Sequence, residues 1–304
     1  MARETQRKEG AQAGILVGPR SSALVIGITA FVRRKPLGAV GAGILIAIIL
    51  IAIMAPFISP HDPYDPSARD IYAQPGGTYL LGGDEAGRDV LSRLFYGARI
   101  SMYVGVISVA IGVTLGSLLG VVSAYAGGKF DLIVQRGVDV AIAFPGIILA
   151  LAIMAALGAS VNNVIIAIVV STLLPGSARV VRSQALSIKE MDYVLAARAI
   201  GASQLRIITL YMAPNCFAIF LVLFTITVGF AIVVESSLSF LGLGVPPDVP
   251  TWGKMLADAG RTDIQSTPWQ SIFPGAAISL TVFAVNFLGD ALRDVLDPRL
   301  RGTR

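Results

Sequence analysis

Long uncharged stretches alternate along this chain with polar segments that hold its charged residues. The uncharged stretches cover residues 37–58, 100–126, 140–178, 214–234 and 269–289. A helix needs about 20 apolar residues to cross a bilayer, so four of these stretches hold one span each. The stretch 140–178 is long enough for two spans, with turn residues at Gly158–Asn163 and with Pro145 and Pro175 tolerable as kinks. The pattern predicts an all-α polytopic membrane protein with six transmembrane helices.

Composition supports a membrane protein and excludes a soluble domain. The 304 residues are 55% hydrophobic and 14% charged, with a mean hydropathy of +0.74. The formal charge of +5 does not indicate nucleic-acid binding, because 18 of the 24 Lys and Arg lie in segments that this topology places on one side. The segments Ser59–Arg99 and Glu235–Pro268 hold the other 6. Positively charged loops stay in the cytoplasm, which places both termini and the segment Ser187–Asn215 there.

The N-terminal segment differs from the rest of the chain. Its apolar run, Ser21–Val32, is too short to span a bilayer and has no signal-peptide cleavage motif after it. We expect residues 1–36 to form a cytoplasmic tail with a short surface helix, and residues 37–304 to form the transmembrane domain.

Small residues recur every fourth position in the second span, at Ser108, Gly112, Gly116, Gly120 and Ala124. This spacing places them on one helix face, where another helix can approach closely, as helices do in lipid. We expect a partner helix in the same chain, with a helix of another subunit as the alternative.

The segment Ser187–Asn215 is a polar insert between two uncharged stretches. Ser187 and Glu190 have the spacing of a capping box, which predicts a helix start. The helix that follows would be apolar on the side of Met191, Val194, Leu195 and Arg198. Gly201 predicts its end in a left-handed cap. These features indicate a docking element rather than a catalytic one.

A second short helix follows in the same insert. Ser203 is a predicted N-cap, and the helix would carry Leu205, Ile208 and Tyr211 to Pro214 at the next membrane boundary.

This insert resembles the coupling loop of bacterial ATP-binding-cassette importer permeases. Ala196, Ala197, Gly201 and Pro214 match that loop, whereas Leu195, Tyr211 and Ala213 replace a Glu, an Ile and a Leu. The resemblance implies that the small Ala pair and Gly sit closely in a cleft of a cytoplasmic ATPase. The residues expected to couple to it are Glu190, Tyr193, Ala196, Ala197, Gly201, Ala202 and Pro214.

Three further segments resemble the C-type permeases of dipeptide, oligopeptide and nickel importers. Tyr79–Arg93 is similar to the segment after their first span, with Gly83 in place of a Thr. Ser239–Gly253 is similar to their outer loop before the last span, and Gly289–Leu300 to their C-terminal signature. The resemblance covers the chain from the first span to its end and implies a type I importer permease fold.

The resemblance also implies partners. They are a sister permease that completes a heterodimer, two cytoplasmic ATPases that bind ATP and Mg, and an extracytoplasmic solute-binding protein, all at a bacterial or archaeal cell membrane. This chain would bind lipid but no cofactor or nucleic acid, would catalyse no reaction, and would import short peptides, with nickel or another small solute as the alternative. The rival classes are a channel or ion-coupled carrier that works alone, and an integral-membrane enzyme.

Residue chemistry weighs against those rivals. Cys216 and His61 are single residues of their kind, so a metal site built from such ligands is not expected. There is no phosphate-binding loop, and Gly41-Ala-Gly43 and Gly242-Leu-Gly244 fail the dinucleotide fingerprint. No ionisable residue lies well inside a predicted span, whereas ion-coupled carriers place such residues there.

Residues near the ends of the spans have two possible roles each, a contact within the chain or its surroundings and a contact with a partner protein. Asp84, Arg88, Asp89 and Arg93 fit i,i+4 pairs on an outer helix, either solvated or in contact with a binding protein. Trp252 is expected at the membrane interface or against a partner. The last group is expected to pair within itself or to contact the ATPases: Asp290, Arg293, Asp294, Asp297 and Arg299.

Overall fold

A computed structural model describes residues 31–67, 69–260 and 266–296. The chain divides into two units, Met1–Pro36 and Leu37–Arg304. Most of the predicted surface helix, Ser21–Val32, lies outside the described residues. In the first unit the described part is a helical turn that Lys35 closes by donating its N–H to Phe31 O at 2.8 Å.

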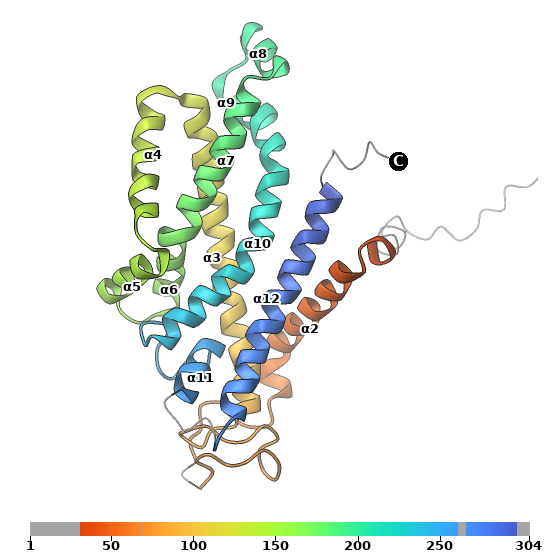
Figure 1. The fold of residues 1–304 in the computed structure, drawn as a ribbon, viewed down its shortest axis with the longest axis vertical. Helices are drawn as coiled ribbons and strands as arrows, with labels where there is room; N and C mark the ends of the chain where they lie inside the picture. The colour runs from red at the N-terminus through yellow and green to blue at the C-terminus, as the bar shows by residue number, and fades with distance from the viewer. Residues whose placement is uncertain (1–30, 68, 261–265, 297–304) are drawn as a thin grey trace, which may run out of the picture. The chain divides into compact units, whose positions relative to one another are not determined.

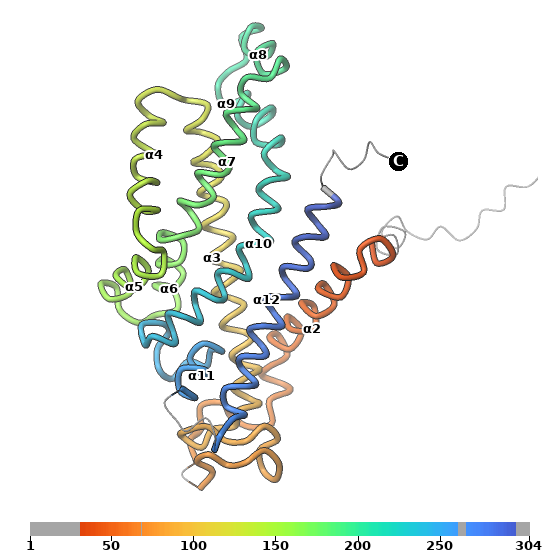
Figure 2. The backbone as a smooth tube through the Cα atoms, in the orientation of Figure 1, coloured from red at the N-terminus to blue at the C-terminus, as the bar shows by residue number. Residues whose placement is uncertain are grey.

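The second unit is a bundle of helices, which Figures 1 and 2 trace from α2 to α12. Two isolated bridges, between Gly76 and Tyr79 and between Gly83 and Asp89, are the only β pairing in the described residues. The helices are α2 (Pro36–Ile58), α3 (Val90–Ala126), α4 (Gly128–Ala143), α5 (Gly146–Leu157), α6 (Val161–Ile168), η1 (Val169–Leu173), α7 (Leu174–Lys189), α8 (Asp192–Ala199), α9 (Gln204–Arg206), η2 (Ile207–Met212), α10 (Ala213–Phe240), α11 (Trp252–Ala259) and α12 (Trp269–Leu296).

Five helices in the described residues are long and apolar enough to cross a membrane. They are α2, α3, the continuous helix Val161–Lys189, the continuous helix Gln204–Phe240, and α12. The bent pair of α4 and α5 makes a sixth crossing when its halves count as one span. The all-α, six-span prediction is confirmed. Three crossings begin earlier in the chain than predicted. The second begins at Val90, the third at Gly128 and the fifth at Gln204.

The third crossing is broken rather than kinked at Pro145. The axes of α4 and α5 differ by 93°. Proline has no N–H to continue a helix, and it pushes the residue before it to extended backbone. Phe144 is extended accordingly, at φ −92° and ψ 141°.

Pro175 and Pro214 instead lie inside continuous helices. A π-helical turn ends two residues before each proline. The turn η1 (Val169–Leu173) precedes Pro175, and η2 (Ile207–Met212) precedes Pro214. In these turns the N–H of Leu174 donates to Val169 O, and the N–H of Ala213 donates to Ile208 O. The wider π turn accommodates the proline, and the helix continues beyond it, as at π-bulges inside other α-helices.

Helix α3 lies at the centre of the bundle, and its stripe of small residues faces α7 of the same chain. All five stripe residues are buried. A Cβ atom on Gly112 would lie 2.5 Å from Leu173 Cβ, and one on Gly120 would lie 2.6 Å from Ala178 O. The close approach is therefore made within the chain, as the sequence favoured.

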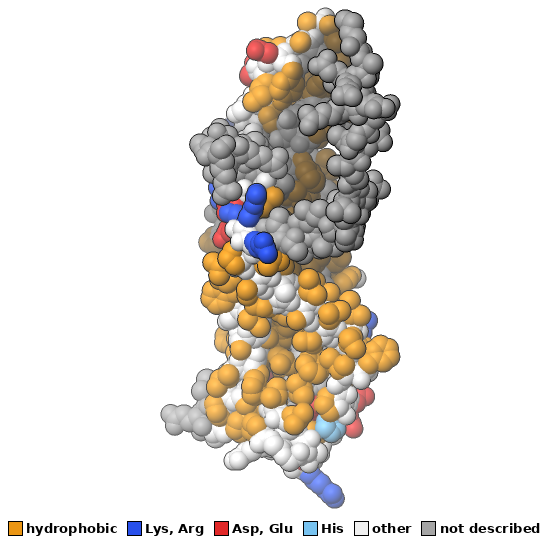
Figure 3. Space-filling model, turned by 90° about the vertical axis from the view of Figure 1, so that its right-hand side faces the viewer, with side chains coloured by type: hydrophobic (Ala, Val, Ile, Leu, Met, Phe, Trp, Pro, Cys, Tyr) orange, Lys and Arg blue, Asp and Glu red, His pale blue; other side chains and the backbone are white. Residues whose placement is uncertain are grey.

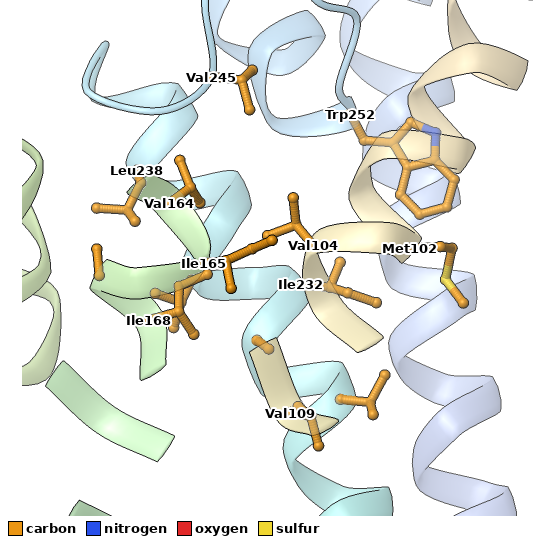
Figure 4. Packing of buried hydrophobic residues seen from close by; sticks show 14 of the residues in the cluster. Met102, Val104, Val109, Val164, Ile165, Ile168, Ile232, Leu238, Val245 and Trp252 are labelled. Carbon is orange, nitrogen blue, oxygen red and sulfur yellow. The ribbon is translucent and has the colours of Figure 1, made fainter. Parts of the chain in front are cut away.

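On another side of α3, buried side chains from α3, α6 and α10 point toward one another. Figure 4 shows Val104 and Val109 of α3 near Ile165 and Ile168 of α6 and Ile232 of α10. This cluster and the small-residue contact hold α3, the α6–α7 helix and α10 together.

Helix α2 contributes one close contact and a broad apolar face. A Cβ atom on Gly41 would lie 2.5 Å from Ala284 O of α12, so this Gly is a packing residue. The other side of α2 exposes Leu37, Ile46, Ile53 and Phe57. Figure 3 shows hydrophobic side chains spread widely over one face of the chain. Such a surface suits lipid or another membrane chain.

Candidate functional site

The candidate site is the segment between α7 and α10, at the opposite end of the bundle from α11 (Figure 1). Helix α7 runs to Lys189, so Ser187 lies inside its last turn and the predicted capping box is wrong. The helix continues because Ile188, only 1% exposed, still packs into the cluster against α3. The Lys189 ammonium donates to Ala124 O and Tyr125 O, both at 3.0 Å, and so caps the end of α3.

Helix α8 begins at Asp192 after an extended Met191, which supplies no side-chain cap. An acidic residue in the first turn and Arg198 in the last turn both suit the helix dipole. Gly201 then has φ +80°, as predicted. The N–H of Gly201 donates to Arg198 O and the N–H of Ala202 to Ala197 O, which is the hydrogen-bond pattern of a Schellman cap.

Ser203 caps the next helix, as predicted, by accepting the Arg206 N–H at 3.4 Å. The prediction of a separate second helix that ends at Pro214 is wrong. From Gln204 the chain continues without a break to Phe240, and Pro214 marks no boundary. Ile207 and Met212 are fully buried in the cluster with α7, so the helix leaves no room for a turn there.

The buried face of α8 is narrower than the sequence indicated. Val194 and Ala197 are buried, whereas Met191 and Leu195 are exposed. The guanidinium of Arg198 lies over the Tyr125 ring at 5.7 Å, which ties α8 to the end of α3. Ala197 therefore faces the chain itself and not a partner's cleft.

Five large apolar side chains of this segment are exposed, and together we name them the coupling surface: Met191, Tyr193, Leu195, Ile200 and Leu205. Ile200 is 83% exposed and Leu205 is 72% exposed. Of the other predicted coupling residues, Glu190, Ala196, Gly201 and Pro214 are exposed and Ala202 is half-buried. The patch offers apolar area on a fixed backbone, which suits binding of a protein and provides no reactive group.

The end of the bundle that carries α11 holds buried charge that sequence reasoning missed. Arg93 is 1% exposed, and it donates to Pro63 O at 3.0 Å and lies 3.3 Å from the Asp84 carboxylate. Asp89 is the N-cap of α3 and accepts from the N–H groups of Leu91 and Ser92. The charge run Asp84–Arg93 is thus neither a solvated helix face nor a free binding surface; Arg88 does pair with Asp84 at 2.7 Å, in a turn.

Glu235 corrects a second expectation, because it is fully buried inside the helix Gln204–Phe240. Its carboxylate accepts from Ser239 Oγ at 2.9 Å and from Ser101 Oγ at 3.3 Å. Glu235 directly follows the predicted fifth span and lies five residues before the end of this helix, so its burial, rather than its position along the sequence, is what the sequence did not indicate.

Trp252 belongs to the same buried region. It is 2% exposed, and its indole N–H donates to Leu94 O at 3.0 Å. It anchors α11 on α3 rather than reaching the membrane interface or a partner. The backbone N–H of Trp252 also donates to Ser101 Oγ at 3.3 Å, a contact across 151 positions that was not visible in the sequence.

Other candidate chemistry is sparse in the described residues. Among them no group of three metal-ligand side chains occurs. Cys216 is a buried free thiol. His61 lies 3.5 Å from Asp89, and Tyr79 donates its hydroxyl to Gly87 O at 3.1 Å. Burial, helped by nearby carboxylates, raises the pKa of Tyr79, so it stays a neutral donor.

The charged residues near the C-terminus are only partly described. Asp290, Arg293 and Asp294 lie exposed on the last turns of α12. Asp297 and Arg299 lie outside the described residues. Gly289 is buried and α12 runs through it to Leu296, so the sixth span has no break at its predicted end.

Two families match this sequence. Residues 112–302 match the family described as binding-protein-dependent transport system inner membrane component. Residues 32–75 match the N-terminal transmembrane domain of oligopeptide transport permease C. The first match covers the last part of α3, from Gly112, and all the helices after it, including the coupling surface.

Curated proteins similar to this chain have matching lengths. A protein of Brucella suis biovar 1, named as a peptide transport system permease, is 41% identical over 92% of this chain and 93% of its own. The dipeptide transport system permease of Alkalihalophilus pseudofirmus is 39% identical over 88% of each. The glutathione transport system permease of Pectobacterium atrosepticum is 40% identical over 86% and 87%.

Proposed function

This chain belongs to the family of binding-protein-dependent transport system inner membrane components, and from this premise we propose that it imports short peptides as one permease subunit of an ATP-driven importer. The names of similar proteins support the substrate class, since they refer to peptide, dipeptide and glutathione transport. Glutathione is itself a small peptide. Nickel or another small solute is the alternative within the wider family.

The coupling surface is the observation that carries the proposal. Its five apolar side chains lie at one end of the bundle. Gly201 ends α8 and Ser203 caps the start of α9, so the backbone between these helices has a defined conformation. Burial of such side chains on association contributes about 25 cal/mol for each Å² removed from water. We assign it to a cytoplasmic ATPase. Glu190, Tyr193, Ala196, Gly201 and Ala202 belong to the same segment, Ala197 is buried in it, and Pro214 lies nine residues beyond Leu205 on the helix that follows.

The remaining assignments follow from the same proposal. A sister permease completes the membrane part, two ATPases bind ATP and Mg, and a solute-binding protein delivers the peptide on the other side. This chain then contributes no covalent chemistry and no cofactor. The Lys and Arg distribution supports both termini in the cytoplasm of a bacterial or archaeal inner membrane.

The test uses the assembled importer in reconstituted vesicles. Ile200→Glu places a charge on the most exposed apolar position of the coupling surface, and Leu80→Glu does the same on the outer loop, where Leu80 is also exposed. Ile200→Glu should lose ATPase co-purification and ATP-dependent peptide uptake, while Leu80→Glu keeps both. Uptake without ATP or partners would instead show a channel or carrier that works alone.

A further inference from the structure

Two ion pairs join α4 to α7, and we name them the polar seam. The Arg182 guanidinium meets the Asp131 carboxylate with both prongs, Nε to Oδ1 at 2.7 Å and a terminal nitrogen to Oδ2 at 2.5 Å. Arg179 pairs with Asp139 farther along α4. A two-pronged Arg–carboxylate pair fixes direction as well as distance, so it resists sliding of one helix along the other.

Among the described residues, few other contacts hold α4. Val138 is its only buried residue, while Phe130, Leu132 and Ile133 are exposed. Gln135 adds a weak bond to Ser123 of α3, at 3.4 Å. Apolar burial therefore contributes little to the attachment of α4, and the two-pronged Asp131–Arg182 pair, with side chains 15% and 29% exposed, fixes α4 against α7.

Helix α7 is fixed to the coupling end. Lys189, at its last turn, binds the carbonyls that end α3, and Ile188 packs with Val194 of α8 in one cluster. A displacement of α8 therefore moves α7 by a similar distance. Because Arg182 and Arg179 lie on the same helix as Lys189, about two and three turns before it, α4 receives the same displacement.

The far end of α4 is the break at Phe144 and Pro145. There Gly146 lies against η1, since a Cβ atom on it would be 2.8 Å from Thr172 Oγ1. Thr172 precedes Arg179, the first charged residue after the uncharged stretch, by 7 residues, or about 10 Å of helix. The break thus lies within the apolar zone, although Ala143, Phe144 and Pro145 are exposed on this chain.

A break at this depth restricts what can cover it. Helix ends carry N–H and C=O groups without intrahelical partners. Lipid satisfies no such group, so irregular backbone in a membrane lies against protein or water. The side of the chain that carries the break therefore faces another subunit or the solute path.

We infer that Asp131 and Arg182, with Asp139 and Arg179, are positioning residues that make the broken crossing α4–α5 follow the coupling surface during transport. This inference rests on the proposed importer function. The seam transmits the displacement of α7 to α4, and the break between α4 and α5 moves with α4. Without the seam, α7 moves with the ATPase and α4 does not.

The experiment exchanges the charges of the two-pronged pair in the assembled importer. Asp131→Arg and Arg182→Asp alone should each lower peptide uptake at least tenfold while ATP hydrolysis continues. The double exchange, Asp131→Arg with Arg182→Asp, should restore at least half of the uptake. Lys129→Asp is the matched control, because Lys129 lies on α4 and its side chain is exposed. Single variants that transport like the parent would overturn the inference.

A second measurement covers variants that insert poorly. Asp131→Cys with Arg182→Cys, in a Cys216→Ala background, should transport weakly until a short thiol cross-linker joins the two helices, and then recover. Loss of the remaining uptake on cross-linking would show that α4 must separate from α7, which contradicts the inference. ATP-dependent uptake by the parent assembly checks the proposed function separately, since its absence would refute that function whatever the seam does.

Discussion

A Cβ atom on Gly116 of α3 would lie 2.5 Å from the carbonyl oxygen of Leu174 in the neighbouring crossing. This contact involves backbone on the α7 side, so no side-chain rotation can relieve it. Ser177 Oγ, which donates to Leu173 O at 2.5 Å, lies against the same Gly. The two crossings are therefore held at a separation that only Gly permits at this position.

Gly116→Ala should destabilise the bundle by about 1–3 kcal/mol, the usual cost of overpacking, and Gly116→Leu should prevent folding. Gly137→Ala is the matched control, because a Cβ atom there meets nothing within 4 Å. Thermal unfolding in detergent measures both. A Gly116→Leu variant that folds and transports like the parent would show that the α3–α7 contact is dispensable.

Gly201→Val should weaken ATPase docking without affecting insertion of the spans. Gly201 has φ +80° and no atom within 4 Å of its Cβ position, so the penalty is conformational, about 1–3 kcal/mol. Gly201→Asn is the control, because Asn tolerates left-handed backbone better than other residues. ATPase co-purification and peptide-stimulated ATP hydrolysis are measured. Equal loss with Asn and Val would point to a cause other than backbone geometry.

Arg93→Met should loosen the outer segment between α2 and α3. The substitution removes the Arg93 donor from Pro63 O and leaves Asp84 paired with Arg88, at a cost of about 1–3 kcal/mol. Arg99→Met is the control, since Arg99 is exposed on the same helix. Limited proteolysis of residues 59–89 reports the effect. Unchanged protection in Arg93→Met would mean that the loop holds its form by other contacts.

Orientation is tested with single cysteines in a Cys216→Ala background. Asp65→Cys should react with an impermeant thiol reagent added to intact cells, and Asp192→Cys should react only after lysis. Both positions are exposed, so access depends on the side of the membrane. Labelling of Asp192→Cys in intact cells would reverse the topology and remove the coupling surface from the cytoplasm.

Short-range features of the chain were predictable from its residues. The six crossings follow from the lengths of the uncharged stretches, and the small-residue stripe from a spacing of four. The left-handed turn at Gly201 and the cap at Ser203 follow from local backbone chemistry. Each of these depends on residues within a few positions of one another.

Element ends and burial were less predictable. The helix α7 runs past Ser187 because Ile188 packs against α3, and η2 joins α9 to α10 because Ile207 and Met212 are buried. The sequence placed Ala197 at a partner surface, whereas the fold turns it inward. Local propensity cannot settle such positions, since tertiary packing outweighs it.

The sequence by itself determined which segments cross the membrane and where the coupling loop turns, because hydropathy, helical period and glycine conformation act locally. Only the tertiary structure decided that Arg93 and Glu235 are buried, that α4 is held by the polar seam, and that Trp252 anchors α11. Those outcomes depend on pairs such as Glu235 with Ser101 and Asp131 with Arg182, which are 134 and 51 residues apart. A buried charge is stable only where such partners meet it, and the fold alone brings them together.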